Sequence, residues 1–581
     1  MKNQLQYFVL GFLAVAGLSS CAGLGKMIQK ANTVTYNVTP SPMEMHGDTI
    51  IVNASGKYPE KYFGKNVTLT ITPTIKYNGG EKTLKPIEVR GEKVKDGNGK
   101  IVAYKAGGSF SFTDKTAYIP EMKNCDLVIK INGRQKKKTK DFPEKKIGDG
   151  TIVTSLLVKN DDQAIMVKGD FQKTFPVTHE TQVFFLINED AIRPSEIKGE
   201  NMTATKKFIN EKRMDMHFIF KNANISAYAS PDGELNFNAN LAEERAKATT
   251  KYYMNASKEK MKDKSDMLTA AMAETFYTVA TTAEDWDGFK SMMQASSIKD
   301  KELILRVLEM YADGDKREQE IKNLSATYNE IRDQILPKLR RSIITWNCEQ
   351  KSRSDEEISK LAASNPDSLS IEEILYASTL TNDMNTKLNI FKNADRMYGN
   401  KDWRCPNNVG YCNIMFNKPI DAQTALEKAK GLSADNPIIM NNLGILARWK
   451  NDRKTAMDYY NKAGSGSEVN HNKGIIDIQN GSYPSAISNF GSECSFNAAL
   501  AKVLGANPDG ALQTLDCSPE KESAITYYLK AIVGARKSNP ELLINNLKIA
   551  ITKDVSFKNK AKEDMEFFKY RDNAEFKALI N

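Results

Sequence analysis

Hydrophobic and polar residues alternate along the first third of the chain, over about residues 33–175. At 67–72 the alternation places Val, Leu and Ile on one face, which is typical of a half-buried strand. Similar runs at 109–112, 127–131 and 152–158 are separated by glycine-containing turns at hairpin spacing. The pattern predicts an antiparallel β-sandwich of about seven strands.

Residues 134–140 form a strongly basic run within this region. Such a run can bind phosphate groups, or it can be a solvated hairpin whose lysines protect an edge strand from pairing with another chain. We favour the hairpin, because turn residues Asn132 and Gly133 precede it directly.

The central part of the chain, residues 176–350, changes to a strand-helix-strand order. A buried strand is predicted at 181–187, a helix from Pro194 to about Glu211, and a second strand at 217–228. This order predicts an α+β domain.

The segment 227–246 carries a family resemblance. It reads Ala-Tyr-Ala-Ser-Pro-Asp-Gly, then Asn238, then Leu-Ala-Glu-Glu-Arg-Ala at the start of a helix. This resembles the peptidoglycan-binding module of OmpA-like proteins, where a strand ends in Gly-Tyr-Thr-Asp and an Asn and Leu-Ser-x-x-Arg-Ala follow. The resemblance covers 176–350 and implies an OmpA-like domain with a helical insertion.

In that family an aspartate and an arginine hold the diaminopimelate of the peptide stem. Arg245 and Asn238 stand at matching positions, but Ser230 replaces the aspartate, and Asp232 lies two residues further on. A hydroxyl accepts a hydrogen bond without neutralising an ammonium group. The resemblance therefore leaves two interpretations open, a working peptidoglycan site or a retained fold that serves as an interaction domain, and we favour the second.

The last region, residues 355–581, repeats a spacing rather than a sequence. A small residue is followed by apolar or small residues at plus twelve, plus four and plus three, as in Gly410, Ala422, Leu426 and Ala429. The same ladder begins at Gly444, a step of 34, and recurs in weaker form at Gly474 and Ala531. It resembles tetratricopeptide repeats and implies an all-α solenoid of five or six helix pairs.

In tetratricopeptide proteins the first helix of each pair lines the concave face. The resemblance implies a peptide groove lined by Asn407, Asn408, Tyr411, Asn441, Asn442, Ile445, Arg448 and Trp449. Amides and aromatic rings there suit an extended segment of a partner protein, and an exposed lining predicts that Arg448 and Trp449 can be replaced without loss of stability. Alternatively, the asparagines only cap or solvate helices.

The N-terminus has the layout of an export signal. Lys2 precedes an apolar stretch at 7–18, and Leu-Ser-Ser-Cys follows at 18–21. This ending resembles the bacterial lipoprotein signal, which implies a signal peptide at 1–20, a lipid on Cys21 and an anchoring linker at 21–32. The alternative is an ordinary secretory signal with an incidental cysteine. No acidic run follows Cys21, as expected for a Bacteroidota lipoprotein on the periplasmic face of the outer membrane.

Six further cysteines fall in a chain expected to enter an oxidising compartment. Cys405 and Cys412 are the nearest pair in sequence and are the predicted disulfide. A zinc site is the second choice, although no Cys-x-x-Cys or nearby histidine supports it.

Composition and motifs limit the classes of function that we expect for this chain. The net charge of +10 is a small difference between 82 basic and 72 acidic residues, so it does not demand a nucleic-acid partner. The chain has no nucleotide-binding, hydrolase or metalloprotease motif, and we expect no cofactor and no metal. We expect a non-enzymatic lipoprotein scaffold that binds envelope proteins through its repeat groove in protein insertion, secretion or fibre machinery. A peptidoglycan tether is the alternative.

Overall fold

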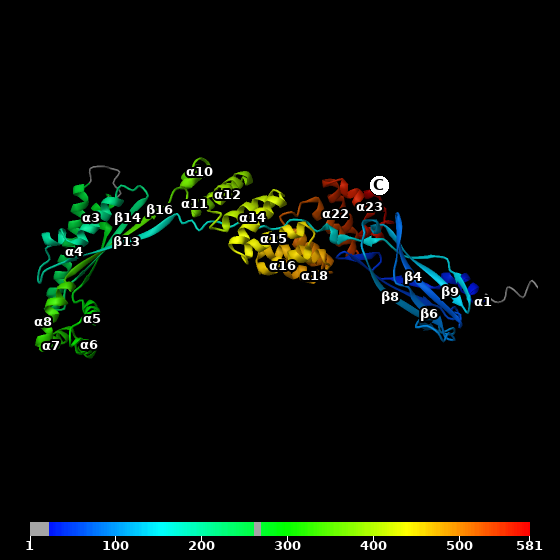
Figure 1. The fold of residues 1–581 in the computed structure, drawn as a ribbon, viewed down its shortest axis with the longest axis horizontal. Coiled ribbons are helices and arrows are strands. Elements are labelled where there is room, and N and C mark those ends of the chain that lie inside the picture. The colour runs from blue at the N-terminus through cyan, green and yellow to red at the C-terminus, as the bar shows by residue number, and fades with distance from the viewer. Residues whose placement is uncertain (1–21, 261–268) are drawn as a thin grey trace, which may run out of the picture. The chain divides into compact units, whose positions relative to one another are not determined.

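A computed structural model describes residues 22–260 and 269–581, so the predicted signal peptide and Cys21 lie outside the described residues. The chain divides into two compact units, one of residues up to Val167 together with Tyr398–Asn581, the other of Lys168–Met397 (Figure 1). No helix in the described ranges is both long and apolar enough to cross a membrane.

The first unit begins with a sheet-rich region, as predicted. One sheet contains β1 (Thr35–Val38), β2 (Met43–His46), β3 (Thr49–Tyr58), β8 (Gly108–Ala117) and β12 (Thr151–Ile152). The other contains β4 (Val67–Tyr77), β5 (Gly80–Thr83), β6 (Ile87–Gly91), β7 (Lys100–Val102), β9 (Cys125–Gln135), β10 (Lys138–Asp141) and β11 (Lys145–Asp149). Ile50, Leu69 and Leu127 share one core between the sheets.

Among the described residues this region has twelve strands rather than the predicted seven. The additional strands are mostly short edge segments, such as β5 and β10, whose residues are all exposed and therefore show no hydrophobic alternation. The basic run belongs to the hairpin of β9 and β10, where Lys138 pairs with Gln135.

The second unit contains a four-stranded sheet in the order β13-β16-β14-β15. Its strands are β13 (Thr174–Phe184), β14 (Phe218–Tyr228), β15 (Tyr277–Thr282) and β16 (Arg341–Lys351). Helices α3 (Glu200–Lys212) and α4 (Leu235–Lys260) pack on the sheet, and the short α2 (Pro194–Ile197) precedes α3. A separate helical cluster with its own core consists of α5 (Trp286–Ala295), α6 (Lys301–Met310), α7 (Gly314–Asn323), α8 (Ser325–Gln334) and α9 (Leu336–Leu339). The single helix predicted from Pro194 is divided because Gly199 is extended and starts α3.

Three further helices also belong to the second unit, so it extends beyond the predicted boundary at residue 355. These are α10 (Asp355–Ser364), α11 (Ile371–Ala377) and α12 (Met384–Tyr398). The segment before β13 holds them, since Phe171 stacks on Tyr376 at 4.4 Å between ring centroids. Lys173 also forms an ion pair with Asp355 at 2.8 Å.

The C-terminal part of the first unit is all-helical, as predicted. Five helix pairs are α13 (Arg404–Met415) with α14 (Pro419–Leu432), α15 (Pro437–Trp449) with α16 (Arg453–Ala463), α17 (Ser467–Gln479) with α18 (Tyr483–Phe490), α19 (Phe496–Leu504) with α20 (Pro508–Cys517), and α21 (Ala524–Arg536) with α22 (Pro540–Lys553). Two short helices follow, α23 (Ser556–Glu563) and α24 (Ala574–Ile580). We call α13–α22 the helix array.

The predicted ladder of small and apolar residues lies between the two helices of each pair. Ala422, Leu426 and Ala429 are fully buried, and a Cβ on Gly410 would lie 2.6 Å from the Leu426 side chain. The pair α19–α20 follows the same ladder, with Ala499 as its first residue, although its sequence is only weakly similar to those of the other helix pairs.

We predict that Gly444→Ala destabilises the helix array by about 1–3 kcal/mol. An added Cβ would lie 2.4 Å from the Tyr460 ring, which is itself fully buried. The matched control is Gly431→Ala on α14, where a Cβ meets nothing within 4 Å and should slightly stabilise the helix. Urea unfolding measures both, and equal effects of the two substitutions would contradict the close approach of α15 and α16.

Candidate functional site

Residues 159–167 run extended along the groove of the helix array, and we call this segment the strap (Figure 1). It follows the β-sheet region in sequence and crosses the helix pairs in the reverse of their chain order, because Lys159 contacts α19 and Val167 contacts α13. The groove predicted to hold a segment of a partner protein thus contains a segment of the same chain.

Four buried asparagines hold the main chain of the strap. Each accepts a hydrogen bond from the N–H and donates one to the C=O of the same strap residue, at 2.7–3.0 Å, in the pairs Asn408–Val167, Asn442–Ile165, Asn472–Gln163 and Asn497–Lys159. A side-chain amide carries one donor group and one acceptor, so it can replace the partner strand that an extended backbone otherwise needs.

The four asparagines occupy one repeated position. Each precedes by two residues the small residue that begins the ladder of its helix pair, as Asn442 precedes Gly444. Successive helix pairs present this position at regular intervals along the groove. Backbone groups on one side of an extended chain also recur every second residue, so the asparagines can contact the same side of the strap. The spacing in the sequence was sufficient to find Asn472 and Asn497, which the predicted groove did not include.

A second row of asparagines supports the first. Asn407 and Asn441 donate to the C=O groups of Ile165 and Gln163 at 3.3 and 2.9 Å. They also accept hydrogen bonds from the next asparagine of the first row, since Asn442 donates to Asn407 at 3.0 Å and Asn472 donates to Asn441 at 2.9 Å. The two rows form a continuous buried network, so their role exceeds helix capping.

An ion pair fixes the strap between two of these contacts. Arg448 binds Asp162 through two of its nitrogens and also donates to the Asn160 side chain at 2.9 Å. The side chains of Arg448 and Asp162 are only 4% and 2% exposed. The indole N–H of Trp449 donates to Asp162 at 2.9 Å. Arg448 is therefore a buried structural residue, and the expectation that it lies exposed in an open groove is wrong.

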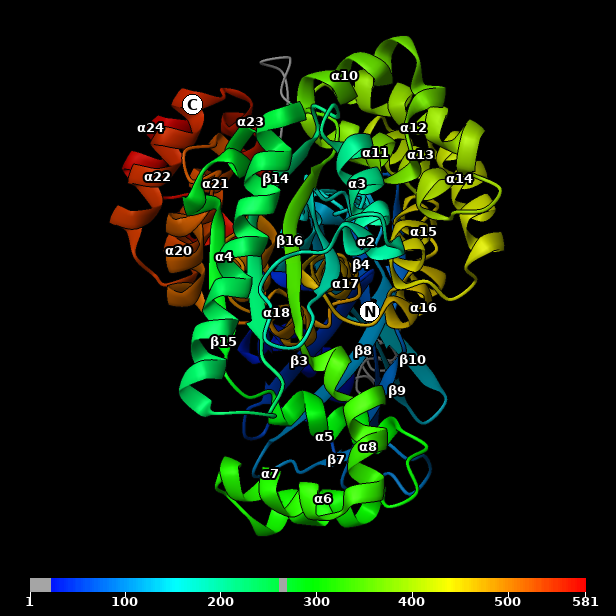
Figure 2. The same ribbon diagram turned by 90° about the vertical axis from the view of Figure 1, so that its left-hand side faces the viewer.

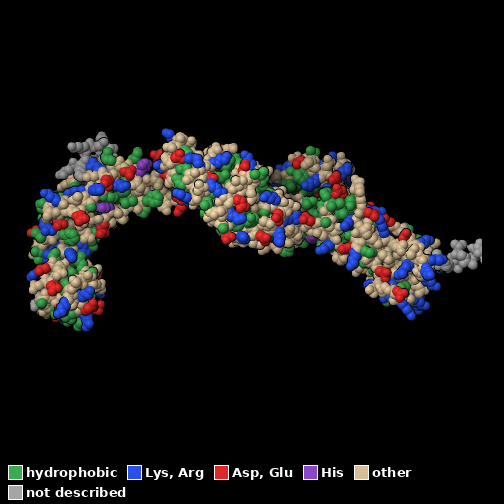
Figure 3. All heavy atoms as spheres, viewed as in Figure 1, with side chains coloured by type: hydrophobic (Ala, Val, Ile, Leu, Met, Phe, Trp, Pro, Cys, Tyr) green, Lys and Arg blue, Asp and Glu red, His purple; other side chains and the backbone are tan. Residues whose placement is uncertain are grey.

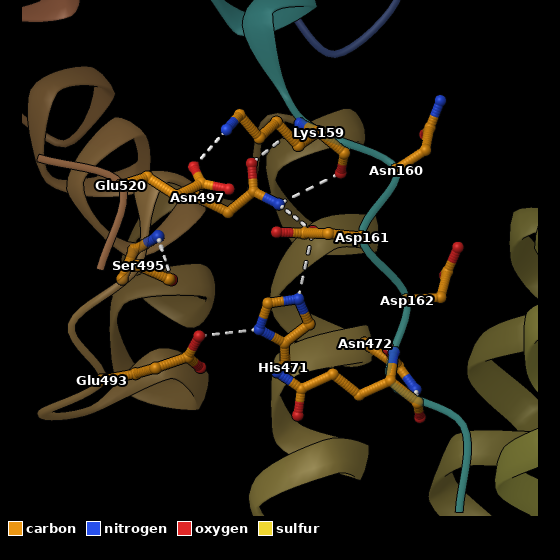
Figure 4. A network of polar contacts seen from close by, with 12 residues as sticks. Lys159, Asn160, Asp161, Asp162, His471, Asn472, Glu493, Ser495, Asn497 and Glu520 are labelled. Carbon is orange, nitrogen blue, oxygen red and sulfur yellow. Dashed lines mark hydrogen bonds and ion pairs between the residues drawn. The ribbon is translucent and has the colours of Figure 1, made fainter. Parts of the chain in front are cut away.

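His471 holds the adjacent strap residue. One ring nitrogen lies 2.8 Å from Glu493 and the other 3.1 Å from Asp161, and Figure 4 shows the ring between the two carboxylates. Burial alone would lower the pKa of His471, but the hydrogen bonds and negative charges of Asp161 and Glu493 outweigh it and raise the pKa to about 9. The ring is therefore protonated at neutral pH.

This raised pKa predicts a specific pH dependence of stability. The unfolded chain has the ordinary histidine value of 6.5, so the contribution of His471 is complete below that pH and is lost as pH rises through 9. Its full size is up to about 3 kcal/mol. Urea unfolding at about pH 6 and about pH 9.5 should show the wild type losing more stability than His471→Gln. A parallel response of the two proteins would contradict the assignment.

The remaining predicted groove residues have other roles. Ile445 is fully buried in a hydrophobic cluster against which Ala164 and Ile165 of the strap pack, while Tyr411 is half-buried on α13. The predicted disulfide between Cys405 and Cys412 is wrong. Both residues are buried in α13, seven positions and about 10 Å apart along one helix, which is too far for a disulfide. The disulfide of the described chain joins Cys494 to Cys517.

The residues that match the OmpA-like motif lie together in the second unit, in the loop after β14 and in the N-terminal half of α4. Arg245 is 1% exposed and donates to the backbone C=O groups of Leu186, Glu189 and Tyr228 at 2.9–3.0 Å. Burial, and next the positive charge of Arg340, lower its pKa to about 10. The guanidinium is thus directed at carbonyl groups of its own domain.

The other three motif residues are also engaged internally. Arg340 donates to the Ser230 hydroxyl at 3.2 Å and forms an ion pair with Asp232 at 3.1 Å, and Ser230 donates to Asp232. Asn238 donates to the backbone C=O of Ser230 at 3.3 Å. A ligand carboxylate would have to replace one of the carbonyl contacts of Arg245, and a ligand ammonium would compete with Arg340 for Asp232.

Charged side chains are intermixed on the face seen in Figure 3, where basic and acidic groups alternate over the helices. The excess of ten positive charges is therefore not gathered there into one basic surface.

No family model and no curated protein matches this chain. Solved structures give partial matches. A tetratricopeptide repeat protein from Parabacteroides merdae is 13% identical, covers 36% of this chain and 91% of its own, with a TM-score of 0.28. The type IV pilus biogenesis factor PilW is 13% identical, covers 40% of this chain and 100% of its own, and has a TM-score of 0.25. Yeast Tom70 is 14% identical, covers 59% of this chain and 77% of its own, and has a TM-score of 0.26. Similarity at these scores does not assign the chain to a family.

Proposed function

We propose that this protein is a non-enzymatic scaffold, anchored by a lipid on Cys21 at the periplasmic face of the outer membrane and serving an envelope assembly. The observation that carries the proposal is the strap. The groove asparagines, among them Asn408 and Asn442, bind the strap, and the strap continues directly from the β-sheet region. The amide network thereby fastens the helix array to the sheet region, and the two form one compact unit.

Direct contacts between the sheet region and the helix array support the same role. Arg536 at the end of α21 binds Glu44 of β2 at 2.7 Å and Glu566 at 2.5 Å. Thr154, shortly before the strap, donates to Glu566 at 2.5 Å. Rigid connection between a membrane-proximal region and a helix array suits a spacer that holds partners at a defined position.

The disulfide between Cys494 and Cys517 supports the exported location, because disulfides persist in oxidising compartments such as the bacterial periplasm. Intact-mass analysis of the purified protein should find acylation at Cys21, and Cys21→Ala should leave the outer-membrane fraction. A Cys21→Ala protein that stays in that fraction would refute the anchor. Affinity purification from detergent-solubilised outer membranes then identifies the assembly, and recovery of no envelope protein would refute the scaffold role.

The occupied groove changes how we expect partners to bind. An external peptide would have to displace the strap, which is attached to the same chain and therefore has a high effective concentration. We propose that partners bind elsewhere on the protein. A photo-crosslinking residue in place of Tyr411 should accordingly capture residues of the same chain, whereas capture of a partner would restore the groove as the binding site.

The peptidoglycan tether is the second proposal, and the internal contacts of Arg245 and Asp232 make it the weaker one. A sacculus pull-down distinguishes the peptidoglycan tether from the scaffold. If the tether is correct, Arg245→Lys should reduce retention on sacculi, because lysine lacks the two-pronged geometry for a carboxylate. Since Arg245 also bonds three backbone C=O groups, circular dichroism of the variant must show an unchanged fold before lost retention is attributed to lost binding.

A further inference from the structure

Among the described residues, the sheet of the second unit ends in a strand that has a strand partner on one side only. β15 is the last strand in the order β13-β16-β14-β15, and it pairs with β14 in parallel from Tyr277 to Thr282. Every residue of β15 after Tyr277 is exposed, and the Val279 side chain is 48% exposed. Helix α4 lies along β14 and β15 on one face of the sheet (Figure 2).

The backbone geometry identifies which groups are available at this edge. The C=O of Thr282 accepts a hydrogen bond from Ala229 after β14, at 3.0 Å, so Thr282 faces β14. Backbone groups alternate sides along a strand, and therefore Val279 and Thr281 direct their N–H and C=O groups to the open side. The C=O of Tyr277 lies on the same side, but its N–H already donates to the C=O of Glu274.

The same three residues form one wall of a groove of about 620 Å³, whose other wall is a stripe of α4. Ala246 and Thr250 form its buried floor. Three exposed lysines lie along the helix stripe, namely Lys247, Lys251 and Lys258, while Glu243 and Glu274 are the acidic residues of the lining. The lining thus has more positive than negative groups and lies beside a row of open backbone groups.

This edge lacks the features that usually prevent pairing with another strand. β15 reads Tyr-Thr-Val-Ala-Thr-Thr, with no charge, no proline and no bulge in its pairing with β14. By contrast, β10 at the edge of the N-terminal sheet has the sequence Lys-Thr-Lys-Asp. Because exposed edges are normally protected by charges or proline, an unprotected one indicates that another strand covers it in use.

We propose that β15 accepts an extended, acidic segment of a partner protein as a fifth strand of this sheet. The segment pairs its backbone with Val279 and Thr281 and directs acidic side chains toward Lys251 and Lys258, while Lys247 is already paired with Glu244 at 2.7 Å. Main-chain hydrogen bonds supply the affinity and the lysines select the charge. This surface is separate from the strap groove and is independent of the lipid anchor.

A labelled peptide tests the proposal on the full-length protein. The probe is fluorescein-Thr-Glu-Thr-Val-Thr-Glu-Thr, and the control peptide has Lys in place of both Glu residues. We expect fluorescence anisotropy to show about tenfold tighter binding of the Glu peptide, decreasing with added salt. Equal binding of the two peptides, or no binding of either, would overturn the proposal.

Two variants locate the site. Val279→Pro removes an N–H that faces the open side, so it should abolish binding without removing a hydrogen bond to β14. Lys251→Glu should weaken binding about tenfold and needs no backbone change. The matched control is Lys207→Glu on α3, an exposed lysine outside the groove lining, which should leave binding unchanged.

The variants also distinguish other occupants. If Val279→Pro lowers the melting temperature, Lys251→Glu alone decides the outcome. Binding that neither Val279→Pro nor Lys251→Glu reduces would place the peptide elsewhere. Concentration-dependent dimers that disappear in Val279→Pro, with no peptide binding, would overturn the proposal by making a second copy of this chain the occupant.

Discussion

Asp162→Ala should destabilise the first unit by about 3–5 kcal/mol, because it leaves the Arg448 guanidinium buried without its carboxylate. The two side chains are 2% and 4% exposed, so water cannot replace the lost partner without opening the groove. Urea unfolding followed by tryptophan fluorescence measures the effect, and Trp449, whose indole also loses its acceptor, is one of the four tryptophans that contribute to the signal.

A double-mutant cycle identifies the cause. The pair Asp162→Ala with Arg448→Met should recover part of the loss, since no buried charge then remains unpaired. The matched control is the exposed pair of Lys577 and Asp572, at 3.1 Å, where Lys577→Ala should cost less than about 1 kcal/mol. Additive effects of the Asp162 and Arg448 substitutions would show that the two residues do not stabilise each other.

Asn442→Asp should destabilise the same unit by roughly 3–5 kcal/mol with almost no change in side-chain shape. The amide of Asn442 donates to Ile165 at 2.9 Å and to Asn407 at 3.0 Å, and a carboxylate would oppose both acceptors. We expect the strap to leave the groove, so limited proteolysis should cut between residues 159 and 167 in the variant before it cuts elsewhere.

The control for this substitution is Asn461→Asp on α16, an exposed asparagine that should change stability by less than about 0.5 kcal/mol. Should Asn442→Asp melt like the wild type and resist proteolysis in the strap, the amide network is not what holds the segment.

Local patterns in the sequence determined much of the secondary structure. The alternation at 67–72 predicts β4, and the ladder from Gly444 to Ala463 predicts the pair α15–α16. Both patterns arise because one side of each element is buried and therefore apolar. The extent of the sheets was less predictable. Short, fully exposed strands such as β10 have no buried side to record.

The candidate sites depended on contacts between distant parts of the chain. The sequence placed Asn408 and Asn442 in a groove with the right chemistry for an extended backbone, yet Val167 and Ile165 lie more than two hundred residues away. No local sequence pattern predicts such a contact, because the strap is neither a paired strand nor a helix and so has no period in its hydrophobic residues.

The disulfide illustrates the same limit. Proximity in sequence favoured Cys405 and Cys412, but a helix separates residues that are seven positions apart. The fold instead brings Cys494, in the loop between α18 and α19, to Cys517 at the end of α20. The sequence alone determined the helix pairs, the sheet-rich region and the first two amides of the row, Asn408 and Asn442. The tertiary structure decided what the amides hold, because hydrogen-bonding groups specify the chemistry of a partner and only the fold determines which segment reaches them.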